Sequence, residues 1–179
     1  MGIPTLITTN TSSNASGSAF TSSIDSTYDE YMFVCTDMHP ETDNVHFEFQ
    51  ANASGQSGYN ETVTTTMFGA AHTEADGGTD LAIRSGDDQG NGTAYQRLEV
   101  NVNASTADES CAGILHLFAP SDTTYTTRFY WRGNSYHNDV ATRATFVAGY
   151  FNVTAAITNI NFQFSSGNIN GLVQMYGIA

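Results

Sequence analysis

Basic residues are nearly absent from this chain of 179 residues. It contains no lysine, and its cations are five arginines, namely Arg84, Arg97, Arg128, Arg132 and Arg143. Against 18 acidic residues they leave a formal net charge of −13 at pH 7. Binding to a polyanion requires clustered cations that displace its counterions, and anionic membrane surfaces attract basic segments. We therefore expect no nucleic-acid partner and no attachment to an anionic membrane.

Long apolar runs and cysteines are also scarce. No run of about 18 apolar residues is present, so we expect no membrane insertion. No cationic segment followed by an apolar one comes after Met1, so we expect no signal peptide. Cys35 and Cys111 are too few for a disulfide framework. Each lies in an apolar run, which favours two buried thiols, with a disulfide between them as the alternative.

Charged residues make up only 13% of the chain, whereas hydrophobic residues make up 40% and aromatic residues 12%. Disordered chains show the opposite balance, so the composition indicates a folded protein. The polar surface must then come mainly from Thr, Ser, Asn and Gly. These residues suit strands and turns rather than helices.

Alternation with a period of two dominates the pattern of apolar residues. Val45–Ala51 and Ile160–Phe164 show it most clearly, and turn signals separate such segments. About ten short strands of this kind predict an all-β fold, an antiparallel β-sandwich of jelly-roll type. The expected core residues include Phe33, Phe47, Leu115, Leu117, Phe162 and Phe164.

The length suits one domain. Residues 19–179 are predicted to form a single β-sandwich domain. Residues 1–18 are predicted to form an N-terminal strand or arm, with Pro4, Leu6 and Ile7 as its assembly residues, followed by a polar tether from residue 10. The arm would pair with a sheet edge of the same subunit or of a neighbour. Residues 70–93, rich in Gly and Asp, are predicted to be a large loop.

The sequence contains no pattern that specifies catalysis. It lacks the G-x-S-x-G motif, and its acids cluster in turns, with Glu48 as the exception within an aromatic-rich strand. We therefore predict no catalytic residue, no cofactor and no firm metal site. Glu74, Asp76 and Asp80 form a weak candidate set of calcium ligands, and the alternative is a solvated acidic loop.

Aromatic residues near position 131 are the candidates for contacts with a sugar, a receptor or another subunit. Trp131 is the only tryptophan, and Tyr130 and Tyr136 lie close to it in the sequence. Residues 129 and 131 share one face of a strand, and residue 130 points to the other face. Packing of Trp131 in the core is the alternative.

Three phrases of the sequence carry a resemblance to a known group of proteins. They are the opening MGIPTLI, the phrase AFTSSIDSTYDEY from Ala19, and the ending INFQFSSGNINGLVQMYGI from Ile160. On these phrases the chain resembles small virion structural proteins of marine tailed bacteriophages, including cyanophages. The resemblance implies no catalytic residues. It implies a place on the virion, as a capsid decoration or a tail or fibre component.

The expected function is therefore that of a non-enzymatic virion structural protein, made in the host cytoplasm. The alternative is a carbohydrate- or receptor-binding module of the adsorption apparatus, with a host surface glycan as its ligand. The expected partners are further copies of the chain, in a homo-oligomer that we predict to be a trimer, and other virion proteins. In salt water the Debye length shrinks to a few ångströms, so the net charge would not prevent close packing.

Overall fold

The computed structural model describes residues 2–179, and these residues form twelve strands and no helix that could cross a membrane. The strands are β1 (Thr5–Ala15), β2 (Ser18–Phe20), β3 (Glu30–Pro40), β4 (Val45–Ala53), β5 (Val63–Thr73), β6 (Thr79–Ile83), β7 (Gln96–Val102), β8 (Cys111–Phe118), β9 (Arg128–His137), β10 (Ala141–Phe151), β11 (Ile157–Phe164) and β12 (Ile169–Ile178). Neighbouring strands pair antiparallel throughout. The predicted all-β antiparallel fold is confirmed.

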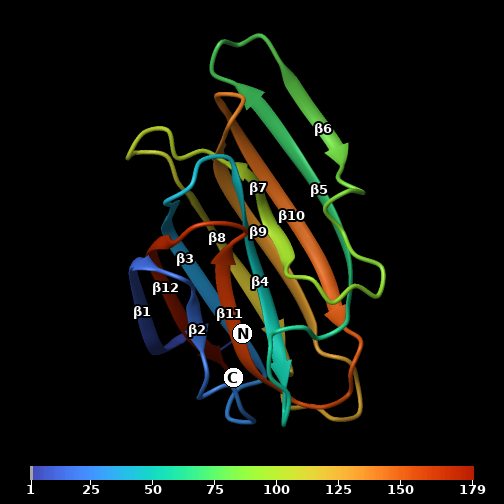
Figure 1. The fold of residues 1–179 in the computed structure, drawn as a ribbon. Coiled ribbons are helices and arrows are strands. Elements are labelled where there is room, and N and C mark those ends of the chain that lie inside the picture. Colours follow the sequence, from blue (N-terminus) through green and yellow to red (C-terminus); the bar gives the residue numbers. More distant parts are fainter. Residues whose placement is uncertain (1) are drawn as a thin grey trace.

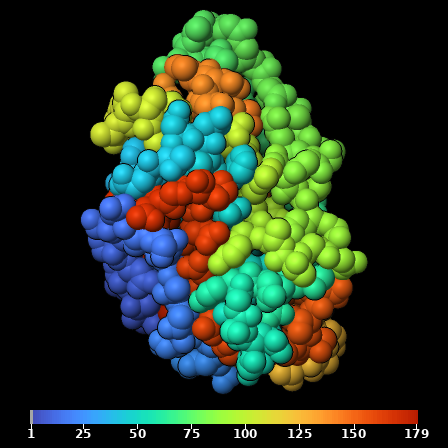
Figure 2. Space-filling model, viewed as in Figure 1, coloured from blue at the N-terminus to red at the C-terminus, as the bar shows by residue number. Residues whose placement is uncertain are grey.

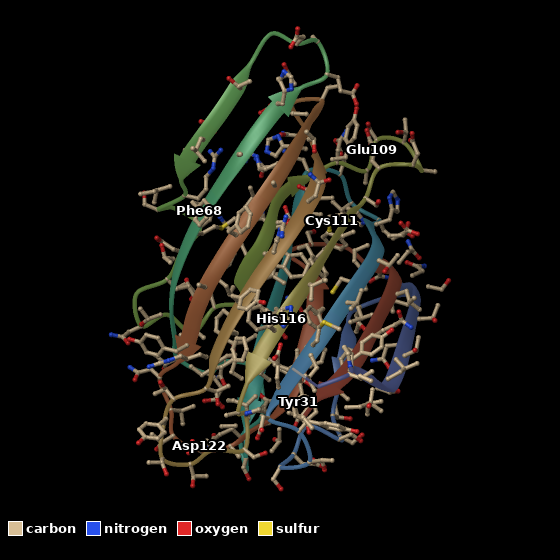
Figure 3. The ribbon with its side chains drawn as sticks, turned by 180° about the vertical axis from the view of Figure 1, so that it is seen from behind. Tyr31, Phe68, Glu109, Cys111, His116 and Asp122 are labelled. Atoms are coloured by element: carbon tan, nitrogen blue, oxygen red, sulfur yellow. The ribbon has the colours of Figure 1, made fainter. Side chains whose placement is uncertain are left out.

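The strands form two sheets that meet at one corner. The larger sheet has the order β1-β12-β3-β8-β9-β10-β5-β6, and the smaller has the order β2-β11-β4-β7. A single residue pair, Val102 with His137, joins β7 to β9 and links the two hydrogen-bonding networks. The smaller sheet lies in front in Figure 1, and Figure 3 shows the larger sheet from behind. The molecule is therefore a two-layered sandwich that is nearly closed at one side.

The order of the strands is that of a jelly roll. Four pairs of strands that follow each other in the chain lie opposite each other in the two sheets, namely β1/β2, β3/β4, β7/β8 and β11/β12. This wrapping of a paired ribbon produces the two Greek keys of a jelly roll. The other four strands, β5, β6, β9 and β10, extend only the larger sheet. The hairpin of β5 and β6 projects beyond the smaller sheet at the top of the molecule (Figure 2).

Aromatic side chains from both sheets fill the space between them. Phe162 of β11 lies 5.6 Å from Phe33 and 5.9 Å from Phe47, measured between ring centroids. Tilted and stacked aromatic pairs of this kind add to the free energy gained by burial. The six core residues predicted from alternation are all buried, namely Phe33, Phe47, Leu115, Leu117, Phe162 and Phe164. That prediction is confirmed.

Cys35 and Cys111 are both buried and free. Burial raises the pKa of both thiols above its usual value. They therefore pack as small apolar side chains between the sheets.

The N-terminal segment differs from the predicted arm and tether. Strand β1 runs along β12 of the same chain from Thr5, opposite Gly177, to Ala15, opposite Ile169. The polar residues from Asn10 onward thus belong to the strand and are not a tether. An edge strand with most side chains in solvent needs no apolar alternation, so its sequence lacks the usual signal.

The assembly residues of the predicted arm lie in and beside β1. Pro4 is exposed just before the strand, Leu6 is 50% exposed, and Ile7 is half-buried against the core. In a single copy this segment is therefore the edge of the larger sheet, completed by its own chain. Pairing of this segment with a neighbouring subunit stays a prediction.

The prediction of a loop over residues 70–93 is wrong for the first half of this range. Strand β5 continues to Thr73, and β6 follows a short turn and pairs with it in an unbroken register. The sequence conceals β6 because the strand has only five residues, of which Asp80 is the second, and so shows only a short apolar pattern. Only the part after Ile83 is a loop of the kind that was expected.

Candidate functional site

The outer face of the larger sheet carries a continuous aromatic and apolar surface. Across it, Phe68 of β5 pairs with Phe146 of β10, which pairs with Arg132 of β9, which pairs with Ile114 of β8. The rings of Phe68 and Phe146 stack 4.9 Å apart and nearly parallel. The guanidinium of Arg132 lies 5.7 Å from the centre of the Phe146 ring, a cation–π contact. We call this surface the aromatic face.

A second group of rings continues the aromatic face across β8 and β9. His116 stacks on Tyr130 at 4.5 Å, and Phe118 lies 5.7 Å from Tyr130. The carboxylate of Glu30 bonds to Nδ1 of His116 at the end of the sheet. Tyr130 is 41% exposed, and partial burial raises the pKa of its hydroxyl. Figure 3 views this face, with Phe68 and His116 labelled on it.

Charge is distributed unevenly around the molecule. The four strands β5, β8, β9 and β10 contain no Asp or Glu, and they contain three of the five arginines, Arg128, Arg132 and Arg143. The carboxylates lie on other strands and in the turns. Over these four strands the aromatic face thus presents no carboxylate to a second acidic molecule, and the nearest one, Glu30, is bonded to His116.

A shallow hollow of about 240 Å³ lies within the aromatic face. Its lining includes Phe68, Tyr130, Phe146 and Ala148 and is almost wholly apolar. It therefore suits an inserted apolar side chain better than a polar reactant.

A larger, polar pocket of about 570 Å³ lies where the turn after β5 approaches the turn before β8. Tyr136 and Asn134 come from β9, Glu74 and Asp76 from the β5–β6 turn, and Asp108 from the β7–β8 turn. The structure therefore brings three of the sequence-predicted residues together, Tyr136, Glu74 and Asp76.

The electrostatics of this pocket disfavour an anionic ligand. Loss of hydration raises the pKa of Tyr136, and the carboxylates of Glu74, Glu109 and Asp108 raise it further. The same carboxylates would repel a ligand of like charge. The pocket, which we call the Tyr136 pocket, suits hydroxyl-rich or cationic groups.

The candidate calcium ligands do not form one site. Asp80 lies on β6 and forms an ion pair with Arg84, whereas Asp76 bonds to Nε2 of His72 at 3.0 Å. Glu74 joins Asp76 at the Tyr136 pocket, from whose lining Asp80 is missing. Within residues 2–179, no three acidic, His or Cys side chains are grouped as metal ligands. The structure does not bring this weak candidate set together, because Asp80 is paired with Arg84 on β6 whereas Glu74 and Asp76 lie in the turn at the Tyr136 pocket.

Trp131, a candidate for surface contacts, lies instead in the core, which was the alternative. It is 1% exposed, and its ring packs against the backbones of Gly113 and Gly133, which pair with each other on β8 and β9. A Cβ added at either glycine would come within 2.4 Å of Trp131 Cζ2. Residue 131 therefore points into the core, and Tyr130 of the same strand points to the aromatic face.

Glu99 is a buried acid that the sequence analysis missed. Its carboxylate accepts hydrogen bonds from Trp131 Nε1 at 2.9 Å, Ser135 Oγ at 3.0 Å and Thr145 Oγ1 at 2.9 Å. Burial raises its pKa to about 7, against the opposing effect of these donors. Because Glu99 is on β7 and its donors are on β9 and β10, it ties the two sheets together. The only signal in the sequence is one acid between Leu98 and Val100.

Comparison with known proteins adds no assignment to these surfaces. No protein-family model matches the chain, and no curated protein is significantly similar to it.

Proposed function

We propose that this chain is a non-enzymatic structural protein of a bacteriophage virion, exposed on the particle as a capsid decoration or a tail or fibre component. The observation that carries the proposal is the aromatic face. Contiguous apolar patches on folded chains mark interaction sites. A face whose central strands carry no Asp or Glu, with the Glu30 carboxylate at its end bonded to His116, suits packing of a chain with a net charge of −13 in a shared assembly.

Two further features support the proposal. The jelly roll is an architecture of viral capsid proteins. The sequence resembles virion proteins of marine tailed phages in its opening, an early phrase and its ending. The proposed partners are therefore copies of the chain and other virion proteins.

The test is the location of the chain on the particle. Gold-labelled antibody against the purified chain should decorate intact particles of the encoding phage at regular positions. Phe146→Ser should weaken the association of the purified chain at least tenfold, because it removes a ring from the centre of the aromatic face. Thr66→Ser on the same face is the matched control. If the chain stays in the soluble part of the lysate and no label binds particles, the proposal is wrong.

The Tyr136 pocket favours a second candidate function, binding of a host surface glycan. A tyrosine ring beside amide, hydroxyl and carboxylate groups provides stacking and hydrogen bonds for a sugar, and the volume of the pocket fits one or two sugar units.

Calorimetry with neutral and amino sugars tests this candidate. Tyr136→Ala should abolish binding, whereas Tyr125→Ala, at an exposed position of another loop, should leave it unchanged. If neither sugar class binds the native chain, or if Tyr136→Ala binds as well as the native chain, the pocket is not a glycan site.

A further inference from the structure

The two sheets end in four edge strands, and three of these are shielded against pairing with another chain. Strand β1 carries two register shifts against β12 and is rich in polar residues. Strand β2 has only three residues, and β7 turns onto β9 at the corner of the sandwich. Short length, irregular pairing and covering are the usual protections of a sheet edge. Strand β6, at the far edge of the larger sheet, has neither a register shift nor a proline.

The hydrogen bonds at both ends of β6 define which residues face its partner. The N–H of Thr73 donates to the carbonyl of Gly78 at 3.0 Å, and the N–H of Arg84 donates to the carbonyl of Met67 at 2.9 Å. Hydrogen-bonded and non-hydrogen-bonded pairs alternate along an antiparallel ladder. The even-numbered residues of β6 therefore bond to β5, and the odd-numbered residues direct their backbone groups away from it.

The odd-numbered residues of β6 are Thr79, Leu81 and Ile83. Within residues 2–179, no backbone group pairs with their N–H or C=O groups. The side chains of Leu81 and Ile83 are 77% and 76% exposed. They lie on the same side of the sheet as Phe68, since Ile83 pairs with it directly. Strand β6 thus offers unpaired backbone groups and an apolar flank at one edge.

The charge of β6 itself is balanced. The carboxylate of Asp80, the only acid of β6, pairs with the guanidinium of Arg84. Two copies of the chain can therefore meet along β6 without setting unpaired carboxylates of this strand against each other. A contact about a two-fold axis is self-complementary, because the same strand supplies donors and acceptors on both sides.

We propose that β6 pairs antiparallel with β6 of a second copy, with Leu81 on the two-fold axis. Thr79 then faces Ile83 of the second copy, all three outward residues on each side form hydrogen-bonded pairs, and the two large sheets join into one. The proposal deepens the assembly role proposed above and names its partner. It predicts even-numbered assemblies, in contrast to the trimer expected from the sequence.

A disulfide between identical positions tests the contact. In Leu81→Cys, the two Cα atoms of a hydrogen-bonded antiparallel pair would lie about 5.5 Å apart, within the range that a disulfide spans. Cys35 and Cys111 are 2% exposed and do not compete for the oxidant. Mild oxidation should convert most of Leu81→Cys into a covalent dimer. Tyr125→Cys, at an exposed position 72% accessible in a distant loop, should stay monomeric on denaturing gels.

A proline substitution gives a second, independent measurement. Leu81→Pro removes an N–H that points outward, so β6 should keep its pairing with β5 while the dimer is lost. Light scattering should then show a monomer with an unchanged denaturation midpoint. Ala82→Pro, which removes an N–H bonded to β5, should instead lower the midpoint.

The outcomes distinguish this proposal from the function proposed above. A covalent dimer of Leu81→Cys with no label on particles would support the β6 contact and overturn the virion role. Label on particles, with Leu81→Cys no more cross-linked than Tyr125→Cys, would overturn the β6 contact alone. A trimer that persists in Leu81→Pro would also overturn it.

Discussion

Replacing Glu99 with Gln is expected to raise the free energy of unfolding at pH 8 by up to about 3 kcal/mol. The pKa of Glu99 is raised from 4.5 to about 7 by burial, and each pKa unit corresponds to about 1.4 kcal/mol. The folded chain therefore favours the protonated acid. This contribution to stability is fully present below pH 4.5 and is lost as the pH rises through about 7. Glutamine does not titrate, so the Glu99→Gln variant keeps its stability as the pH rises to 8.

The hydrogen bonds around position 99 survive this substitution. The amide oxygen of Gln accepts from Trp131 Nε1, and its NH₂ group donates to the hydroxyls of Ser135 or Thr145, which rotate. Urea denaturation of both proteins between pH 4 and 8 measures the effect. The native chain should lose stability relative to Glu99→Gln across this range.

Asp29→Asn is the matched control, since it makes the same charge change at an exposed position. Its stability should follow that of the native chain within about 0.5 kcal/mol. If Glu99→Gln and the native chain lose stability in parallel from pH 4 to 8, Glu99 does not titrate with a raised pKa, and the expectation is wrong.

Trp131→Ala is expected to lower the free energy of unfolding by about 3–5 kcal/mol, the cost of removing a large buried aromatic side chain. Two effects act together. The ring fills the space above two paired glycines, and its Nε1 donates to the Glu99 carboxylate. Loss of the ring leaves a cavity and removes a donor from a buried acid. Guanidinium denaturation near pH 6 measures the change.

Tyr130→Ala is the matched control, because it truncates the neighbouring aromatic residue on the opposite face of the same strand. Its stability should fall by about 1 kcal/mol or less, since the side chain is already 41% exposed. The free energy of unfolding of Trp131→Phe should lie between those of the two alanine variants, because phenylalanine keeps an aromatic ring but lacks the Nε1 donor. Equal effects of Trp131→Ala and Tyr130→Ala would contradict the placement of Trp131 in the core.

Tyr130 and Trp131 are neighbours on β9, but one side chain is partly exposed and the other is buried. Alternation predicts that these residues point in opposite directions. It does not say which face meets the other sheet, because both faces of β9 are rich in large side chains. Burial of Trp131 depends on Gly113 and Gly133, which lie together only after β8 and β9 pair.

Much of the fold was determined by the sequence alone. Short alternating segments and turn signals predicted an antiparallel jelly roll and six core residues, because a half-buried strand must alternate between solvent and core. Which residues of a half-buried strand are buried follows from the alternation of apolar and polar side chains, and this alternation can be read from the sequence.

Only the tertiary structure decided the edges and the sites. Strand β6 and most of β1 escaped prediction because an edge strand is stabilised by backbone hydrogen bonds to its neighbour, which impose no pattern on its side chains. Pairing of strands also joined Tyr136 to two of the predicted acids and separated Asp80 from them. The raised pKa of Glu99 depends on its burial where β7 meets β9 and β10, strands that lie far from it in the chain. Such properties arise from contacts between segments distant in sequence, and those contacts exist only in the folded chain.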